Sequence, residues 1–226
     1  AAFLFRLDGA RIPIGEVDGS ITPRRQEVGA ILSSMAGFET ELRSDMDAWL
    51  KTHVALLMPS LAPALRAAGD DNVRLAHTQD AMILALRAIR EGFRVLKALG
   101  YPIVPEGIRI FAWVPEPVLV WVFRKRFTAP QVRVALVEHS EAARDEIQHL
   151  ADEFRVLVRQ TSIPTPAMDR LYAYFDSEVP PMLEGSNSIP LDWRFLWGIA
   201  GVLSALLAFG MLLLRPSRKR MSARHP

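Results

Sequence analysis

The spacing of hydrophobic positions along this 226-residue chain changes near residue 44. Before that point, short apolar stretches alternate with turn residues, and one segment has helical spacing. Thr22 offers a capping hydroxyl and Pro23 suits the first helical position, while Gly37 suits a helix end. The expected elements are strands at 3–7, within 10–20 and at 38–42, and a helix over 22–37. Residues 1–43 therefore predict a β-β-α-β unit that is too small to be a domain by itself.

After Ser44, apolar residues recur every three or four positions, which predicts helices that share one core. We expect helices over about 44–61, 73–99, 118–127, 131–160 and from 165 to 175. The expected core positions are Met46, Leu50, Val54, Leu57, Leu61, Met82, Leu86, Ile89, Phe93, Leu96, Val134, Val137, Ile147, Leu150, Phe154, Leu157, Met168, Leu171 and Phe175. Gly100 should end the second helix. Residues 44–176 thus predict an all-helical domain, and the fold class is mainly α.

The C-terminal part has a different composition. Residues 177–194 contain Pro, Gly and Ser in the pattern of a linker. Residues 195–214 carry no charge, and twenty helical residues span about 30 Å, the thickness of the bilayer core. Trp193 and Trp197 at one end and the basic tail at 215–226 suit the two membrane interfaces. We expect a single-pass transmembrane helix at 195–214, in contact with the lipid bilayer; the alternative is a buried helix of the domain.

The orientation of that span is left open by the sequence. The basic tail favours a cytoplasmic C-terminus, which would place residues 1–190 on the other side of the membrane. Nothing in the sequence would export that body, so we expect the helical domain to be cytoplasmic. The chain begins at Ala1 rather than Met, which suggests a fragment or a processed product.

Charge and composition exclude several functions. Five of the 27 Lys and Arg residues lie in the last twelve positions, and the rest of the chain has a net charge of −3. Because we see no basic stripe with interleaved aromatic residues in that body, we expect no nucleic-acid partner. The absence of cysteine excludes disulfides and thiolate sites, and the histidines and acids match no known set of metal ligands.

Several segments, taken in order, resemble the 2-dehydropantoate 2-reductase (ketopantoate reductase) family. They are IGEVDG (14–19), DAWLKTHVALL (47–57), AIREGFRVLKALGYPI (88–103), RDEIQHL (144–150) and TPAMDRLYAYF (165–175). That family has an N-terminal Rossmann domain and a helical C-terminal domain, with the active site between them. The resemblance implies that residues 1–43 are the tail end of a Rossmann domain, that 44–176 are the helical substrate and dimerisation domain, and that the chain is N-terminally truncated.

The resemblance also assigns candidate catalytic and cofactor-binding residues. Lys51 matches the family's general acid, whose ammonium polarises the ketone and donates a proton; without the resemblance, a solvated edge is the usual place of a helical lysine. Glu146 matches the glutamate near the nicotinamide end of the cofactor, and its alternative is a surface carboxylate paired with Arg144 or His149. Glu91 matches in position as well, but we expect it to serve packing or capping.

Departures from the family pattern affect the substrate site. The family's asparagine one turn after the lysine falls on Ala55, and its substrate-binding serine falls near Val134, with Ser140 close by in sequence but out of phase. We name Ser140 and His53 as substitute substrate-binding candidates. A packed, hydrogen-bonded histidine is the alternative for His53, which points about 200° around the helix from Lys51.

No GxGxxG loop follows any expected strand, so NADPH, the cofactor that the resemblance implies for the full-length protein, cannot be bound by this chain alone. Our leading hypothesis is the C-terminal part of a membrane-tethered NADPH-dependent oxidoreductase that reduces a 2-keto acid or related carbonyl. On this hypothesis the chain alone is inactive, and pairing through the helical domain would give a homodimer. The alternative is a non-catalytic, membrane-anchored interaction domain derived from the same family. Binding of anionic lipid by the basic tail is compatible with both.

Overall fold

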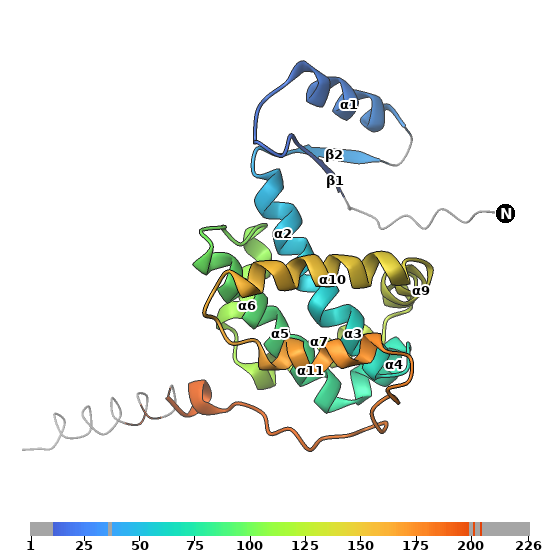
Figure 1. Ribbon diagram of the computed structural model, residues 1–226, viewed down its shortest axis with the longest axis vertical. Helices are drawn as coiled ribbons and strands as arrows, with labels where there is room; N and C mark the ends of the chain where they lie inside the picture. Colours follow the sequence, from blue (N-terminus) through green and yellow to red (C-terminus); the bar gives the residue numbers. More distant parts are fainter. Residues whose placement is uncertain (1–10, 36–37, 199–200, 202–203, 205–226) are drawn as a thin grey trace, which may run out of the picture.

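The computed structural model describes residues 11–35, 38–198, 201 and 204. It shows a small β-α-β unit at one end and a larger helical domain at the other, with helix α2 leading from the first into the second (Figure 1). The fold is mainly helical, as predicted. The strand expected at 3–7, most of the predicted span at 195–214 and the tail at 215–226 lie outside the described residues.

The β-α-β unit consists of β1 (Arg11–Ile14), α1 (Pro23–Ser34) and β2 (Glu39–Leu42). The two strands are parallel, and α1 is the crossover between them. Thr22 caps α1, because its hydroxyl accepts a hydrogen bond from the Arg25 amide at 3.1 Å. The structure confirms the predicted helix start and the two later strands.

Helix α1 contacts the sheet through small and polar residues. A Cβ on Gly29 would lie 2.9 Å from Leu42 Cδ2, so helix and strand are in close contact at this point. Val28, Ile31 and Met35, which follow helical spacing, are 40–56% exposed. The side of α1 that meets the sheet is instead formed by Arg25 and Gly29, which are its buried residues.

The first long helix of the helical domain is continuous but bulged. It comprises α2 (Met46–Leu56), a π-helical turn η1 (Leu57–Leu61) and α3 (Ala62–Ala67). Pro59 lacks an amide hydrogen and cannot bond to the carbonyl of Ala55 four residues earlier. The Ser60 hydroxyl donates to that carbonyl at 3.0 Å and to Leu56 O at 2.7 Å, so the π-turn leaves neither oxygen unpaired.

The helix predicted over 73–99 is two helices, α4 (Asn72–His77) and α5 (Gln79–Ala98). Thr78 separates them with extended backbone, a conformation typical of the N-cap position that threonine favours. Helix α5 is the centre of the domain. Gly100 ends it as predicted, with φ +86°, and the amide of Tyr101 closes a Schellman motif by donating to Leu96 O at 2.9 Å.

The remaining helices surround α5. They are η2 (Glu106–Arg109), α6 (Ile110–Trp113), α7 (Glu116–Phe127), α8 (Pro130–Val132), η3 (Arg133–Glu138), α9 (His139–Ala142), α10 (Arg144–Arg159), α11 (Pro166–Tyr172) and η4 (Ala173–Phe175). The single helix predicted over 131–160 is interrupted at Ala143, whose backbone leaves the helical region. Helix α10 packs against α2 and η1, and α11 packs along α5 (Figure 1).

Most predicted core positions are buried. Those with less than 9% of their surface exposed are Leu61, Met82, Leu86, Ile89, Phe93, Leu96, Val137, Ile147, Phe154, Met168, Leu171 and Phe175. Met46, Val54, Leu57, Leu150 and Leu157 are only half-buried, and Leu50 on α2 is 41% exposed. The side chain of Val134 lies outside the described part of the structure.

The segment predicted as a linker, 177–194, lies against the helical domain, and we call it the strap. It has no helix or strand up to residue 193, yet its backbone amides are bound at several points. Met182 N donates to Ala67 O at 2.8 Å, and Ser188 and Ile189 donate to the buried carboxylate of Asp80. The strap therefore has the composition of a linker but follows an ordered path along the domain. Within the described residues, no helix is both long and apolar enough to cross a membrane.

Candidate functional site

Lys51 lies on α2, in the half of the helix nearest the β-α-β unit. Its ammonium forms an ion pair with Asp47, one turn earlier, and lies 4.4 Å from the centroid of the Tyr101 ring. The side chain is 23% exposed. Lys51 is therefore neither freely solvated nor enclosed: an ammonium held by two neighbours keeps part of its surface open to a ligand.

Tyr101 reaches Lys51 because the chain turns back after α5. The positive φ of Gly100 reverses the chain, and the Tyr101 ring then faces α2. Thr52, fully buried on α2, donates its hydroxyl to Ala48 O at 2.7 Å and accepts a long hydrogen bond of 3.5 Å from Val104 N. The loop after α5 is thus attached to the helix that carries the lysine.

His53 packs against another ring on α2. It stacks on Trp49, with ring centroids 4.9 Å apart and planes at 10°. The surrounding protein atoms lower the pKa of His53, and the nearby His139 lowers it further. The residue as a whole is exposed and its side chain makes no hydrogen bond with any described residue, so its role as a substrate donor stays a prediction.

Glu146 and Ser140 are not joined to Lys51 by any hydrogen bond or ion pair among the described residues. Glu146 is exposed in the first turn of α10. The surface pairs suggested for it do not form, because Arg144 pairs with Asp70 and His149 pairs with Glu153. Ser140 is buried on α9, 3% exposed. The proposed roles of both residues stay predictions.

Ala55, the position at which the resemblance would place an asparagine, lies where α2 crosses α5. Ala55 is fully buried, and a Cβ on Gly92 of α5 would lie only 3.1 Å from its methyl group. An amide at this position would meet α5 rather than a ligand.

Glu91, the neighbour of Gly92 on α5, caps α11. Its carboxylate accepts hydrogen bonds from the amides of Ala167 and Met168 at 2.9–3.1 Å. The capping role predicted for Glu91 is confirmed.

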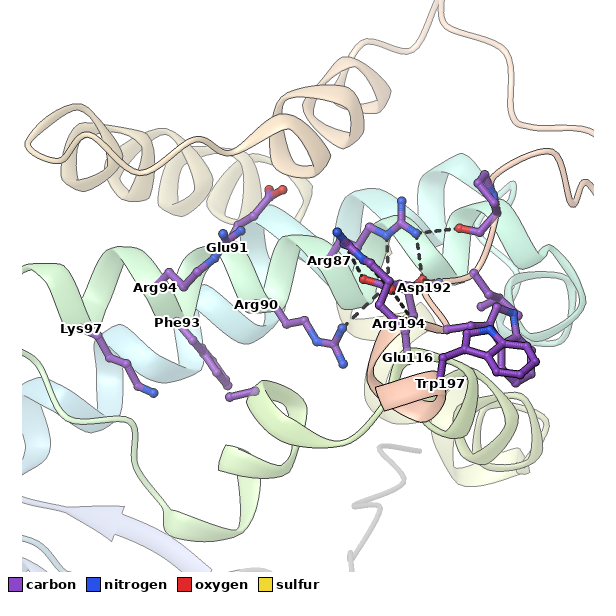
Figure 2. A pocket seen from close by; sticks show the side chains of 14 residues that line it. Arg87, Arg90, Glu91, Phe93, Arg94, Lys97, Glu116, Asp192, Arg194 and Trp197 are labelled. Atoms are coloured by element: carbon purple, nitrogen blue, oxygen red, sulfur yellow. Dashed lines mark hydrogen bonds and ion pairs between the residues drawn. The ribbon is translucent and has the colours of Figure 1, made fainter. Parts of the chain in front are cut away.

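The sequence analysis missed a basic stripe on α5. It consists of Arg87, Arg90, Arg94 and Lys97, whose spacing of three, four and three residues places them along one side of the helix. Nearby acids balance these charges in the composition, so the net charge does not reveal the stripe. It lines a groove of about 800 Å³, here called the α5 groove, which also involves Phe93, Ala112, Glu116 and strap residues 190–194 (Figure 2).

One end of the α5 groove is a buried ion-pair network. Arg87 donates to both oxygens of Glu116, at 2.9 and 2.8 Å, and to Pro190 O at 2.8 Å. The Glu116 carboxylate also accepts from the strap at Asp192 N, 2.9 Å away. Arg194 binds the side chain of Asp192 and lowers its pKa to about 2. These contacts fix the strap on α5 and α7.

The turn between β1 and α1 is where a Rossmann-type unit would receive a phosphate. In this chain a carboxylate occupies it: Glu16 accepts from the Thr22 hydroxyl at 2.6 Å and pairs with Arg24, and both lower its pKa. Gly15 serves close packing, since a Cβ there would lie 2.5 Å from Arg43 O. This turn is therefore filled by the protein's own carboxylate and offers no site for a phosphate.

Among residues 11–35, 38–198, 201 and 204, no cluster of three or more His, Asp or Glu side chains could hold a metal ion. Comparisons with protein-family models, with curated proteins and with solved structures gave no match to this chain.

Proposed function

We propose that this chain is the C-terminal part of a membrane-tethered reductase, similar to ketopantoate reductases, that acts on a 2-keto acid or a related carbonyl. The observation that carries the proposal is the setting of Lys51. Its ammonium is held by Asp47 and Tyr101 at the end of the helical domain that faces the β-α-β unit. A substrate bound between the two parts would meet this group first.

The chemistry assigned to Lys51 is polarisation of the carbonyl and donation of a proton. An ammonium has three N–H donors, and Asp47 accepts from only one of them. A second can approach the carbonyl oxygen, stabilise negative charge that develops there and supply the proton of the alcohol product. The Tyr101 ring, which lies against the ammonium, restricts the directions from which a substrate can approach.

The reductant would have to be held by residues outside this chain, because no expected strand of this sequence is followed by a GxGxxG loop. The exposed apolar residues Val28 and Ile31 on α1 and Met35 just after it support a wider sheet at this point. Further parallel strands beside β1 and β2 would cover such a face. On this proposal, residues 11–42 are the end of a larger Rossmann-type domain.

The test is NADPH oxidation in the presence of 2-keto acids, by the intact product isolated from its membrane. Lys51→Ala should lower kcat by about 100-fold or more, the usual contribution of a general acid. Lys125→Ala, the same change at an exposed lysine of α7, is the matched control and should keep full activity. Equal activity of the two variants would exclude Lys51 as the proton donor.

The second candidate function is a non-catalytic interaction domain, and the buried Ala55 favours it. Without an amide at this position, the domain lacks the substrate contact that the family resemblance implies. The intact mass of the native product separates the two functions. A mass near 25.3 kDa would favour the interaction domain. A mass larger by a nucleotide-binding domain, on the order of 150 residues, would favour the reductase.

A further inference from the structure

The α5 groove carries two cations that form no ion pair within the described part of the chain. Arg94 and Lys97 are exposed, and neither makes a hydrogen bond or an ion pair with any described residue. Figure 2 shows both side chains at the end of the groove away from the Arg87–Glu116 network, with no dashed line to either. The nearby acid Glu91 feels the charge of Arg94, but its carboxylate is hydrogen-bonded to the N-terminus of α11 rather than to the arginine. This end of the groove is therefore ready to bind an anion.

The end of the groove that holds the Arg87–Glu116 network also carries an exposed aromatic rim. Trp193 and Trp197 line it and are 48% and 72% exposed. Phe195 is 57% exposed and shares a smaller adjoining hollow with Trp113, which is 64% exposed. Four large aromatic side chains exposed at one rim are uncommon on a protein surface that faces water. Tryptophan favours the boundary between lipid headgroups and acyl chains.

The sequence places this rim next to the apolar segment. Trp193 and Trp197 flank the start of residues 195–214, which carry no charge. The hydrogen bonds from Asp192 N to Glu116 and from Arg87 to Pro190 O hold the chain on α5 immediately before that segment. If residues 195–214 enter a bilayer, the α5 groove therefore lies at the membrane surface.

We propose that the α5 groove binds the headgroup of an anionic phospholipid, with Arg94 and Lys97 contacting its phosphate and the aromatic rim lying against its glycerol and upper acyl region. The proposal rests on the membrane anchor of the proposed function. A cationic end and an aromatic end in one groove match an amphiphile better than a free phosphate, which would use the cations alone.

The experiment uses the full chain in phosphatidylcholine vesicles that contain a small share of brominated lipid, either phosphatidylglycerol or phosphatidylcholine. Bromine quenches tryptophan fluorescence at short range, so the ratio of the two quenching efficiencies measures the preference for the anionic lipid. Each basic residue near an anionic membrane contributes about fivefold to binding. Arg94→Gln with Lys97→Gln should therefore lower the preference by about 25-fold.

The matched control is Arg159→Gln with Arg170→Gln, which removes the same charge from two exposed positions outside the groove. All variants keep every tryptophan and the basic tail, so the difference reports on the groove. An unchanged preference in the Arg94 and Lys97 variant, or an equal fall in the control, would overturn the proposal.

Two further arms separate the sources of failure. Flotation with phosphatidylcholine vesicles tests the anchor alone: a chain that does not float would refute the anchor and, with it, the groove's position at the membrane. A chain that floats without a groove-dependent preference would refute only the lipid site. Soluble glycerol phosphate should not reduce the quenching by brominated phosphatidylglycerol, and competition by it would identify a free phosphate ligand instead.

Discussion

Replacing Glu91 by alanine should lower the free energy of unfolding by about 3 kcal/mol. The Glu91 carboxylate is 3% exposed and accepts hydrogen bonds from the amides of Ala167 and Met168 at 2.9–3.1 Å. Each buried amide left without an acceptor costs about 1–3 kcal/mol. Burial disfavours the charge and raises the pKa of Glu91, which removes part of this benefit and places the expected loss near the lower half of the summed range.

Urea unfolding of the full chain in detergent, followed by far-ultraviolet circular dichroism, would measure this loss. Glu91→Gln keeps one oxygen as an acceptor and should cost less, about 1–2 kcal/mol. Glu141→Ala, at an exposed glutamate, is the control and should change stability by less than about 0.5 kcal/mol. If Glu91→Ala were as stable as that control, the capping of α11 from α5 would contribute nothing and the argument would be refuted.

Two other substitutions test the packing of α2. Gly92→Val should cost about 2–3 kcal/mol in the same unfolding experiment, because even a Cβ would lie 3.0 Å from Met168 Cε and 3.1 Å from the Ala55 methyl group; an unchanged stability would show that the helices can separate there. His53→Phe should flatten the pH dependence of stability. Packing and His139 lower the pKa of His53 below its ordinary value of 6.5, so the unfolded chain takes up the proton first and stability falls as the pH drops through 6.5 and below. Phenylalanine can still stack on Trp49 but cannot titrate, and an equally steep loss of stability in the variant would assign the effect to another group.

The predictable parts of the fold are those fixed by local chemistry. Thr22 and Pro23 start α1 as expected, and Gly100 ends α5 because the left-handed backbone at that position favours glycine. The break at Thr78 was not predicted, since it contains neither glycine nor proline. The bulge around Pro59 depends on the Ser60 hydroxyl, which a hydrophobic pattern does not describe.

The site shows the same division between local and distant contacts. The ion pair of Lys51 with Asp47 follows from their spacing of four residues, but its contact with Tyr101 depends on a chain reversal fifty residues later. The groove cations were visible as a spacing pattern on α5. Their significance depends on the strap, which brings Trp193 and Asp192 beside them.

The bonds from the strap to Asp80 and Glu116 determine how the helical domain connects to everything that follows residue 194. A free chain of the strap's length could reach about 60 Å and would let the domain rotate in any direction. Clamped along the domain, the strap has no such slack. The chain therefore leaves from one fixed point beside α5, and a pull on its C-terminal end is transmitted directly to Arg87 and Glu116. The strap therefore acts as a rigid connection, and it fixes which face of the helical domain is turned toward the segment that follows residue 194.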